Sequence, residues 1–262
     1  MSLLENNSIG IIIQVRSSST RFKNKFKKKI NHQSVILFLI KRILNYKKNI
    51  KLIIAIPKKD QKVYAHIKKE KKIIIFHGSK NDVLDRYYKC AQKFKLDTIV
   101  RLTGDNPLID LDLMFDSLNK HVTLKKKFTT NCINETFPNG FEYEILDKII
   151  LNYIWKNSFL KSDREHVTPY IYKMIENKKL KSSEIISVKD KKKKFKFIRL
   201  TIDKPLDLLV VKKVYNLLKK HKLQINFKNI IKIFKLYKKV FFMNQSEIRD
   251  EGYEISILNE KK

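Results

Sequence analysis

The sequence is poor in cysteine and contains no long apolar run. Its two cysteines, Cys90 and Cys132, are too few for a disulfide scaffold and lack the paired spacing of a zinc site, which favours a reducing compartment. No apolar run approaches the roughly 18 to 20 residues of a membrane span, and the N-terminal residues show no basic region followed by an apolar core. We therefore expect a cytoplasmic protein with no membrane partner.

Arginine is also scarce, although the formal net charge is +32. Only 8 of the 58 basic residues are arginines, and the lysines are spread from Lys23 to Lys262. Lysine is sufficient where a surface only needs solvation, whereas a bidentate contact needs arginine. Clustered arginines interleaved with aromatic residues, as nucleic-acid binding would require, are lacking. We therefore interpret the charge as a solvated lysine-rich surface and expect no nucleic-acid partner; a basic nucleic-acid-binding protein is the less favoured alternative.

Apolar, β-branched segments alternate with amphipathic stretches along the first 110 residues. Strands are predicted at residues 9–15, 52–56, 73–76 and 98–102, and covering helices at 35–46 and 82–94. This alternation indicates βαβ units. The sequence therefore predicts an α/β fold with a Rossmann-like, mostly parallel sheet flanked by helices.

The pattern becomes less regular after Asp110. We expect a small α+β insertion over residues 131–180 and a helical C-terminal extension over 226–262, while the end from Asn244 is weakly specified. Ser162 and Asp163 are cap candidates for a helix over 165–175. The other predicted elements are strands at 142–145 and 195–202, and helices at 112–121, 146–155, 206–218 and 227–239.

Hydroxyl and cationic side chains follow the first predicted strand, in the segment IGIIIQVRSSSTRFKNK at residues 9–25. Arg16, Arg21 and Lys25 carry charge at neutral pH, and residues 17–20 add hydroxyl groups that suit phosphate oxygens. Open α/β sheets bind ligands at the carboxyl ends of their strands. Neither GxxxxGK[ST] nor GxGxxG occurs, so the loop indicates a nucleotide enzyme of another kind.

Two aspartates follow later strands. Asp105 stands in VRLTGDNPLID and Asp203 in RLTIDKPLD, each with a proline two residues further on. A carboxylate beside a triphosphate loop is a natural ligand of Mg²⁺, which takes few carboxylates together with phosphate oxygens. Turn formation or helix capping is the alternative for both.

The segment HGSKNDVLDRY offers Gly78 and Ser79 for close approach to a base and Arg86 for a contact with nucleotide. An ion pair between Asp82 and Arg86, four residues apart on one helix, is the structural alternative.

The segment SDREHVTPY places Arg164, Glu165 and His166 in a row. His166 is a candidate general base or hydroxyl-binding group, and a capped helix start with a hydrogen-bonded histidine is the alternative.

Six ordered segments resemble the cytidylyltransferases that include CMP-sialic acid and CMP-Kdo synthetases, and most closely the spore coat polysaccharide biosynthesis protein F branch. They are QVRSSSTRFKNK, GSKNDVLDRY, RLTGDNPLID, PNGFEYE, REHVTPY and IDKPLDL, and the ending NQSEIRDEGYEISI is similar as well. Where the family usually has Pro-Gly, this chain has Lys23 and Asn24, and Asn24 can take the left-handed conformation of that glycine. Ser18 replaces another usual glycine, and Asn139 and Glu142 stand at usual aspartate positions.

The resemblance implies a nucleotide-diphospho-sugar transferase type of fold and transfer of CMP from CTP to a sugar hydroxyl, typically of a keto-deoxy sugar acid, with release of pyrophosphate and with Mg²⁺. Residues 1–225 would form the nucleotidyltransferase domain, and a homodimer contact is expected within residues 131–175 by analogy. An A-type glycosyltransferase is the alternative, but Asn106 and Pro107 follow Asp105 where those enzymes usually carry a D-x-D pair. The expected catalytic residues are Arg16, Lys25 and Asp105, and the expected metal ligands are Asp105 and Asp203. The expected sugar contacts are Glu142, Arg164, Glu165 and His166. The expected nucleotide contacts are Gln14, Arg16, Ser19, Thr20, Arg21, Lys25, Gly78, Ser79, Asp82, Arg86 and Thr103.

Overall fold

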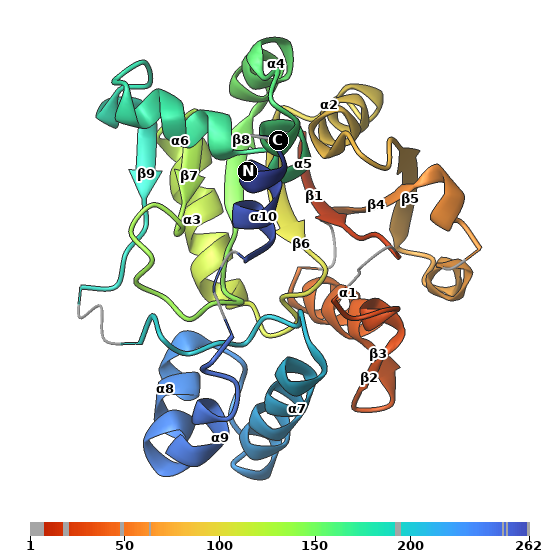
Figure 1. Ribbon diagram of the computed structural model, residues 1–262, viewed down its shortest axis with the longest axis vertical. Helices are drawn as coiled ribbons and strands as arrows, with labels where there is room; N and C mark the ends of the chain where they lie inside the picture. Colours follow the sequence, from red (N-terminus) through yellow and green to blue (C-terminus); the bar gives the residue numbers. More distant parts are fainter. Residues whose placement is uncertain are drawn as a thin grey trace.

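A computed structural model describes residues 8–17, 21–47, 50–62, 64–191, 195–247, 249 and 251–260. Within these ranges seven strands form one sheet in the order β5-β4-β1-β6-β8-β7-β9 (Figure 1). The pairs β5–β4, β4–β1, β1–β6 and β7–β9 are parallel, whereas β8 is antiparallel to both of its neighbours. The strands are β1 (Ile9–Gln14), β4 (Lys51–Pro57), β5 (Ile73–Gly78), β6 (Thr98–Thr103), β7 (Phe128–Thr130), β8 (Glu144–Asp147) and β9 (Ile185–Ser187); β2 (Lys29–Ile30) and β3 (Gln33–Ser34) form a separate hairpin.

Helices cover both faces of the sheet because successive apolar residues of each strand point to opposite sides. Ile11 and Ile13 of β1 belong to a buried cluster with α1 and α3, whereas Ile12 belongs to a second cluster with α2, α4 and α6. A third cluster joins α7, α8 and α9. The helices are α1 (Val35–Tyr46), α2 (Val83–Lys93), α3 (Leu111–Thr123), α4 (Lys148–Asn157), α5 (Lys161–His166), α6 (Pro169–Glu176), α7 (Pro205–Lys220), α8 (Phe227–Leu236), α9 (Lys238–Phe242) and α10 (Glu251–Glu260).

The mostly parallel sheet and its helical layers confirm the predicted fold class, but the strand expected at 195–202 is wrong. Residues 195–197 form a turn, and Arg199 makes only an isolated bridge to Asn139. The apolar alternation there reflects burial of Ile198, Leu200 and Ile202 in the third cluster. Gly140 allows this crossing, since its φ is +104° and a Cβ would lie 2.5 Å from the Leu200 carbonyl carbon.

The helix expected at 165–175 is two helices, α5 and α6, because Val167 takes a positive φ of 76°. Ser162 and Asp163 therefore lie inside α5 and do not cap a helix. Asp163 is buried and both of its carboxylate oxygens accept from Lys173 Nζ at 2.9 Å. The predicted helix at 227–239 likewise ends at Leu236, and α9 follows separately.

The C-terminal extension is helical, as predicted, but its helices pack against different parts of the protein. Helices α8 and α9 pack against α7, whereas α10 returns to lie beside α5 (Figure 1). Across the described parts of the chain, no helix has the length and hydrophobicity needed to cross a membrane. The dimer contact within 131–175 stays a prediction; large apolar side chains exposed there are Ile149, Tyr153, Phe159 and Leu160.

Candidate active site

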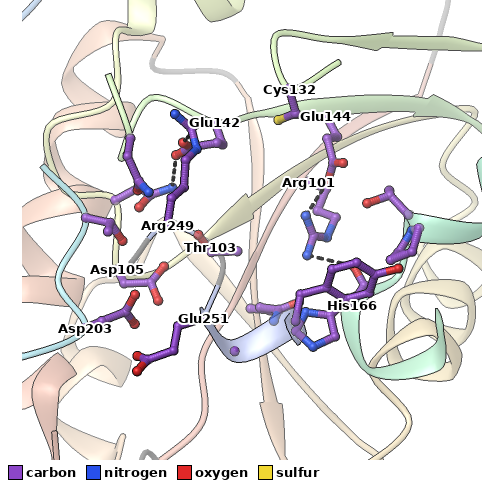
Figure 2. A pocket seen from close by; sticks show the side chains of 18 of the residues that line it. Arg101, Thr103, Asp105, Cys132, Glu142, Glu144, His166, Asp203, Arg249 and Glu251 are labelled. Carbon is purple, nitrogen blue, oxygen red and sulfur yellow. Dashed lines mark hydrogen bonds and ion pairs between the residues drawn. The ribbon is translucent and has the colours of Figure 1, made fainter. Parts of the chain in front are cut away.

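A cavity of about 720 Å³ opens at the carboxyl ends of β1 and β6. Figure 2 shows two groups of side chains on opposite sides of it. One group comprises Asp105, Asp203 and Glu251, and the other comprises Arg101, Glu144 and His166. The position agrees with the general rule that parallel α/β sheets bind ligands at the carboxyl ends of their strands.

The two aspartates predicted as metal ligands converge on one ammonium group. Lys25 Nζ lies 2.6 Å from Asp105 Oδ2 and 2.9 Å from Asp203 Oδ1. Burial alone would lower the pKa of Lys25, but the two carboxylates outweigh it and raise that pKa. Burial likewise opposes ionisation of Asp105, but Lys25 and Thr103 outweigh it and hold the pKa of Asp105 below its usual value. The two carboxylates therefore meet at one buried ammonium group, with Lys25 and Asp105 in their charged forms at neutral pH, and their role as metal ligands stays a prediction.

Local sequence explains how these groups reach the cavity. Arg101, Thr103 and Asp105 alternate along β6 and its end, so they face the same side. Gly104 lets this strand end approach β1, because a Cβ there would lie 2.4 Å from Val15 Cγ1. Asn24 has a φ of 55°, the left-handed conformation expected of it, and the turn that follows buries the side chain of Lys25.

The two arginines of the first loop also have carboxylate partners. Arg21 donates to Asp203 Oδ1 at 3.1 Å and to Glu251 Oε2 at 2.9 Å. Arg16 donates to Glu165 Oε1 at 2.7 Å. Gln14, Arg16, Arg21 and Thr103 line the cavity, as expected, whereas Ser19 and Thr20 lie outside the described residues. The cations at this end are therefore paired with protein carboxylates that anionic phosphate oxygens could replace.

The opposite end of the cavity contains an ion pair that the sequence analysis missed. Arg101 and Glu144 face each other across β6 and β8, and Arg101 donates to Glu144 Oε2. Tyr172 donates to Glu144 Oε1 at 2.5 Å, and Arg101 also donates to the His166 carbonyl oxygen at 3.1 Å. Burial raises the pKa of the adjacent Cys132 thiol, which keeps it protonated. Arg101 lies two residues before Thr103 on the same predicted strand, so the alternation of side chains along a strand could have identified it as facing the cavity.

Two of the predicted sugar contacts, Glu142 and His166, line the cavity, and each of them contacts a residue near the C-terminus. Glu142 accepts from Gly140 N at 2.6 Å and from Arg249 Nη2 at 2.8 Å. Arg249 and Glu142 lie above Asp105 in the view of Figure 2. His166 Nε2 lies 3.0 Å from Ser256 Oγ, and burial lowers the pKa of His166 to about 4. Its imidazole is therefore neutral at pH 7.

Six other predicted residues are absent from the described lining of the cavity: Gly78, Ser79, Asp82, Arg86, Arg164 and Glu165, the last of which pairs with Arg16. The alternative ion pair between Asp82 and Arg86 is wrong, because Asp82 caps α2 and accepts from Arg164 Nε at 2.7 Å. Arg86 is fully buried and donates to the Ser79 carbonyl oxygen at 2.6 Å. A Cβ at Gly78 would lie 2.7 Å from Arg86 Cγ. Asp82 and Arg164, like Ser79 and Arg86, are therefore joined to each other by hydrogen bonds outside the described lining.

The C-terminal residues Arg249, Glu251, Gly252 and Tyr253 line the cavity and were also missed. Helix α10 has no buried residue, and polar contacts hold it to the rest of the protein. Its Glu260 carboxylate accepts from the Ser162 backbone N–H and hydroxyl, both at 2.7 Å. The sequence feature that could have identified these residues is the acidic stretch RDEGYE at 249–254, which stands out in a lysine-rich chain.

Asp105 and Asp203 are the carboxylates that this end of the cavity offers to Mg²⁺. In the described ranges, no three His, Cys, Asp or Glu side chains form a metal-binding group. Two carboxylates that reach one point nevertheless fit Mg²⁺, because this ion commonly takes one or two carboxylates and completes its shell with substrate phosphates and water.

Comparison with known proteins agrees with this geometry. Residues 10–248 match the protein family described as Cytidylyltransferase. The spore coat polysaccharide biosynthesis protein SpsF of Bacillus subtilis (strain 168) is 33% identical over 172 residues, which cover 63% of this chain and 70% of that protein.

Two solved structures extend the comparison. A cytidylyltransferase from Leptospira borgpetersenii serovar Hardjo-bovis (strain JB197) is 26% identical, with a TM-score of 0.82 over 93% of this chain and 100% of that chain. A CMP:2-keto-3-deoxy-manno-octonic acid synthetase complexed with CTP is 15% identical, with a TM-score of 0.58 over 79% of this chain and 98% of that chain. At 15% identity, the similarity to the second structure shows a shared fold.

Proposed function

The chain belongs to the cytidylyltransferase family, and from this premise we propose that it transfers CMP from CTP to a sugar hydroxyl, with release of pyrophosphate. The observation that carries this proposal is the convergence of Asp105 and Asp203 on Lys25, with Arg16 and Arg21 lining the same cavity. Cations gathered at the carboxyl ends of two parallel strands suit a triphosphate.

The reaction needs positioning and charge neutralisation, and no covalent nucleophile. The sugar oxygen forms a bond to the α-phosphorus, the bond to the pyrophosphate oxygen breaks, and the hydroxyl proton passes to water. Arg16, Arg21 and Lys25 would hold phosphate oxygens, replacing the carboxylates that they contact now. Mg²⁺ held by Asp105 and Asp203 would neutralise further triphosphate charge.

We propose a keto-deoxy sugar acid as the acceptor. The motif resemblance to CMP-sialic acid and CMP-Kdo synthetases supports this choice, as does the shared fold with the keto-deoxy-octonic acid enzyme. The relative SpsF, named for spore coat polysaccharide biosynthesis, supports a role in making a surface polysaccharide. With CTP as the substrate, the reaction is proposed to take place in the cytoplasm.

The test is pyrophosphate release by the purified protein with Mg²⁺, each of the four ribonucleoside triphosphates, and 2-keto-3-deoxy-manno-octonic acid or N-acetylneuraminic acid. We expect turnover with CTP and one of these acids, and a loss of about 100-fold or more in Asp105→Asn, because a charge-stabilising group is removed. Asp116→Asn, an exposed aspartate on α3, is the matched control and should keep full activity. Turnover of a nucleotide sugar with none of CTP would instead support the glycosyltransferase alternative.

A further inference from the structure

A buried asparagine joins the C-terminal part of the chain to the nucleotide end of the cavity, by which we mean the end that contains Lys25, Asp105 and Asp203. Asn244 follows α9 and is fully buried, which is unusual for a polar side chain. Its Nδ2 group donates to Asp207 Oδ1 at 2.8 Å and to the Arg199 carbonyl oxygen at 3.3 Å. The buried amide therefore takes part in a polar network with two residues that flank Asp203 in sequence.

Asp207 is the centre of this network. It is fully buried in the first turn of α7 and accepts from Arg199 Nε at 2.9 Å and Nη2 at 3.1 Å. Its Oδ2 atom also accepts from the backbone N–H groups of Asp203 and Lys204, both at 2.9 Å. Burial opposes its ionisation, but the Arg199 guanidinium and these donors outweigh burial and lower the pKa of Asp207.

The network fixes both the backbone and the side chain of Asp203. Asp207 holds the Asp203 backbone N–H, and Arg199 Nη2 donates to Asp203 Oδ2 at 3.3 Å. The other carboxylate oxygen, Oδ1, is thereby directed toward Lys25 and Arg21 at 2.9 and 3.1 Å. A carboxylate held on one oxygen presents the other to the cavity in a single orientation, as outer partners of metal ligands commonly arrange.

We propose that Asp207 and Asn244 are positioning residues for this reaction: they hold Asp203 in the orientation that binds Mg²⁺ and CTP. The C-terminal stretch that begins at Asn244 then supports the nucleotide end of the site, besides lining the cavity with Arg249 and Glu251. This inference rests on the proposed function and adds the residues that set one of its two carboxylates.

A purely structural role would make Asp207 equivalent to Asp110, which supplies a matched control. Asp110 is also a buried aspartate at a helix start, where it accepts from Leu113 N at 3.0 Å and from Phe227 N at 2.6 Å. It lies outside the described lining of the cavity. Asp110→Asn therefore removes a comparable buried cap without touching the network around Asp203.

The experiment measures the Kd for CTP by isothermal titration calorimetry, with Mg²⁺ and with EDTA, and the thermal unfolding midpoint of each protein. The variants are Asn244→Ala and Asp207→Asn, compared with Asp110→Asn and the unmodified chain. Both network variants should raise the Kd with Mg²⁺ by about tenfold or more and leave the Kd with EDTA within about twofold. Asp110→Asn should lower the unfolding midpoint and leave both Kd values unchanged.

The inference is wrong if Asn244→Ala binds CTP with Mg²⁺ as the unmodified chain does, or if its Kd rises equally with and without Mg²⁺. Asn244→Ala decides the question even if Asp207→Asn does not fold. If the unmodified chain binds another nucleotide and not CTP, the proposed function fails in its substrate, and the same comparison with that nucleotide still tests the network. Binding of no nucleotide would refute both.

Discussion

Replacing Lys25 with methionine tests the central arrangement of the site most directly. The Lys25 side chain is 8% exposed, and its two partners, Asp105 and Asp203, are 21% and 17% exposed. Removing one member of a buried ion pair costs about 3 to 5 kcal/mol, and the partial exposure of the carboxylates favours the lower value. For a domain of this size, about 3 kcal/mol corresponds to a fall of roughly 6 to 12 °C in Tm.

The pH dependence of this loss has a definite sign. Because the pKa of Asp105 is lowered in the folded protein, its contribution to stability is full above the unfolded pKa of about 3.9 and is lost as pH falls through the folded value. Because the pKa of Lys25 is raised, its contribution is full below the unfolded pKa of about 10.4 and is lost as pH rises through the folded value. The stability difference between the unmodified chain and Lys25→Met should therefore be largest between these limits and shrink at both ends.

The assay is thermal unfolding followed by circular dichroism over this pH range, with and without Mg²⁺. The variant removes the counter-ion that the two carboxylates share, so Mg²⁺ should raise its Tm more than that of the unmodified chain. Lys27→Met, an exposed residue of the same turn, is the control and should change neither quantity. Equal Tm values for the two variants at pH 7, or an equal response to Mg²⁺, would refute the reasoning.

Three further predictions concern the cavity. Glu251→Gln should lower the Kd for CTP in calorimetry by about two- to fivefold, because it removes the carboxylate that pairs with Arg21, whereas Glu254→Gln, exposed on the same helix, should not. Arg249→Met should raise the KM for the sugar by about tenfold or more in the pyrophosphate assay, with the CTP affinity unchanged, because a charged hydrogen-bond donor is lost. Since the pKa of His166 is lowered to about 4 in the folded protein, below about pH 6.5 this residue binds more protons in the unfolded chain than in the folded one. The free energy of unfolding therefore decreases as the pH falls, and urea unfolding should show a smaller decrease in His166→Gln than in the unmodified chain.

Local sequence patterns were sufficient to predict the fold class and to identify the candidate site residues that lie close to the ends of β1 and β6. Strand β1 and the helix α1 follow from apolar runs and helical spacing, because burial on one or both faces imposes a period on the sequence. Asp105 and the cations of the loop after β1, which include Lys25, were identifiable because polar residues that follow a buried parallel strand reach the ligand-binding edge of the sheet. The same kind of periodicity led to the wrong prediction of a strand at residues 195–202, because alternate residues can be buried without a partner strand.

Contacts between distant residues had to come from the tertiary structure. The sequence alone predicted that the Asp105 and Asp203 carboxylates belong to one site, but only the fold shows that Lys25 joins them. Helix α10 carries no strong apolar periodicity and is held by polar contacts, so no local pattern could place it over the cavity. The pairing of Arg101 with Glu144 depends on the antiparallel register of β6 and β8. Sequence therefore determined which segments are buried and which residues end the strands, whereas long-range packing decided which charges meet.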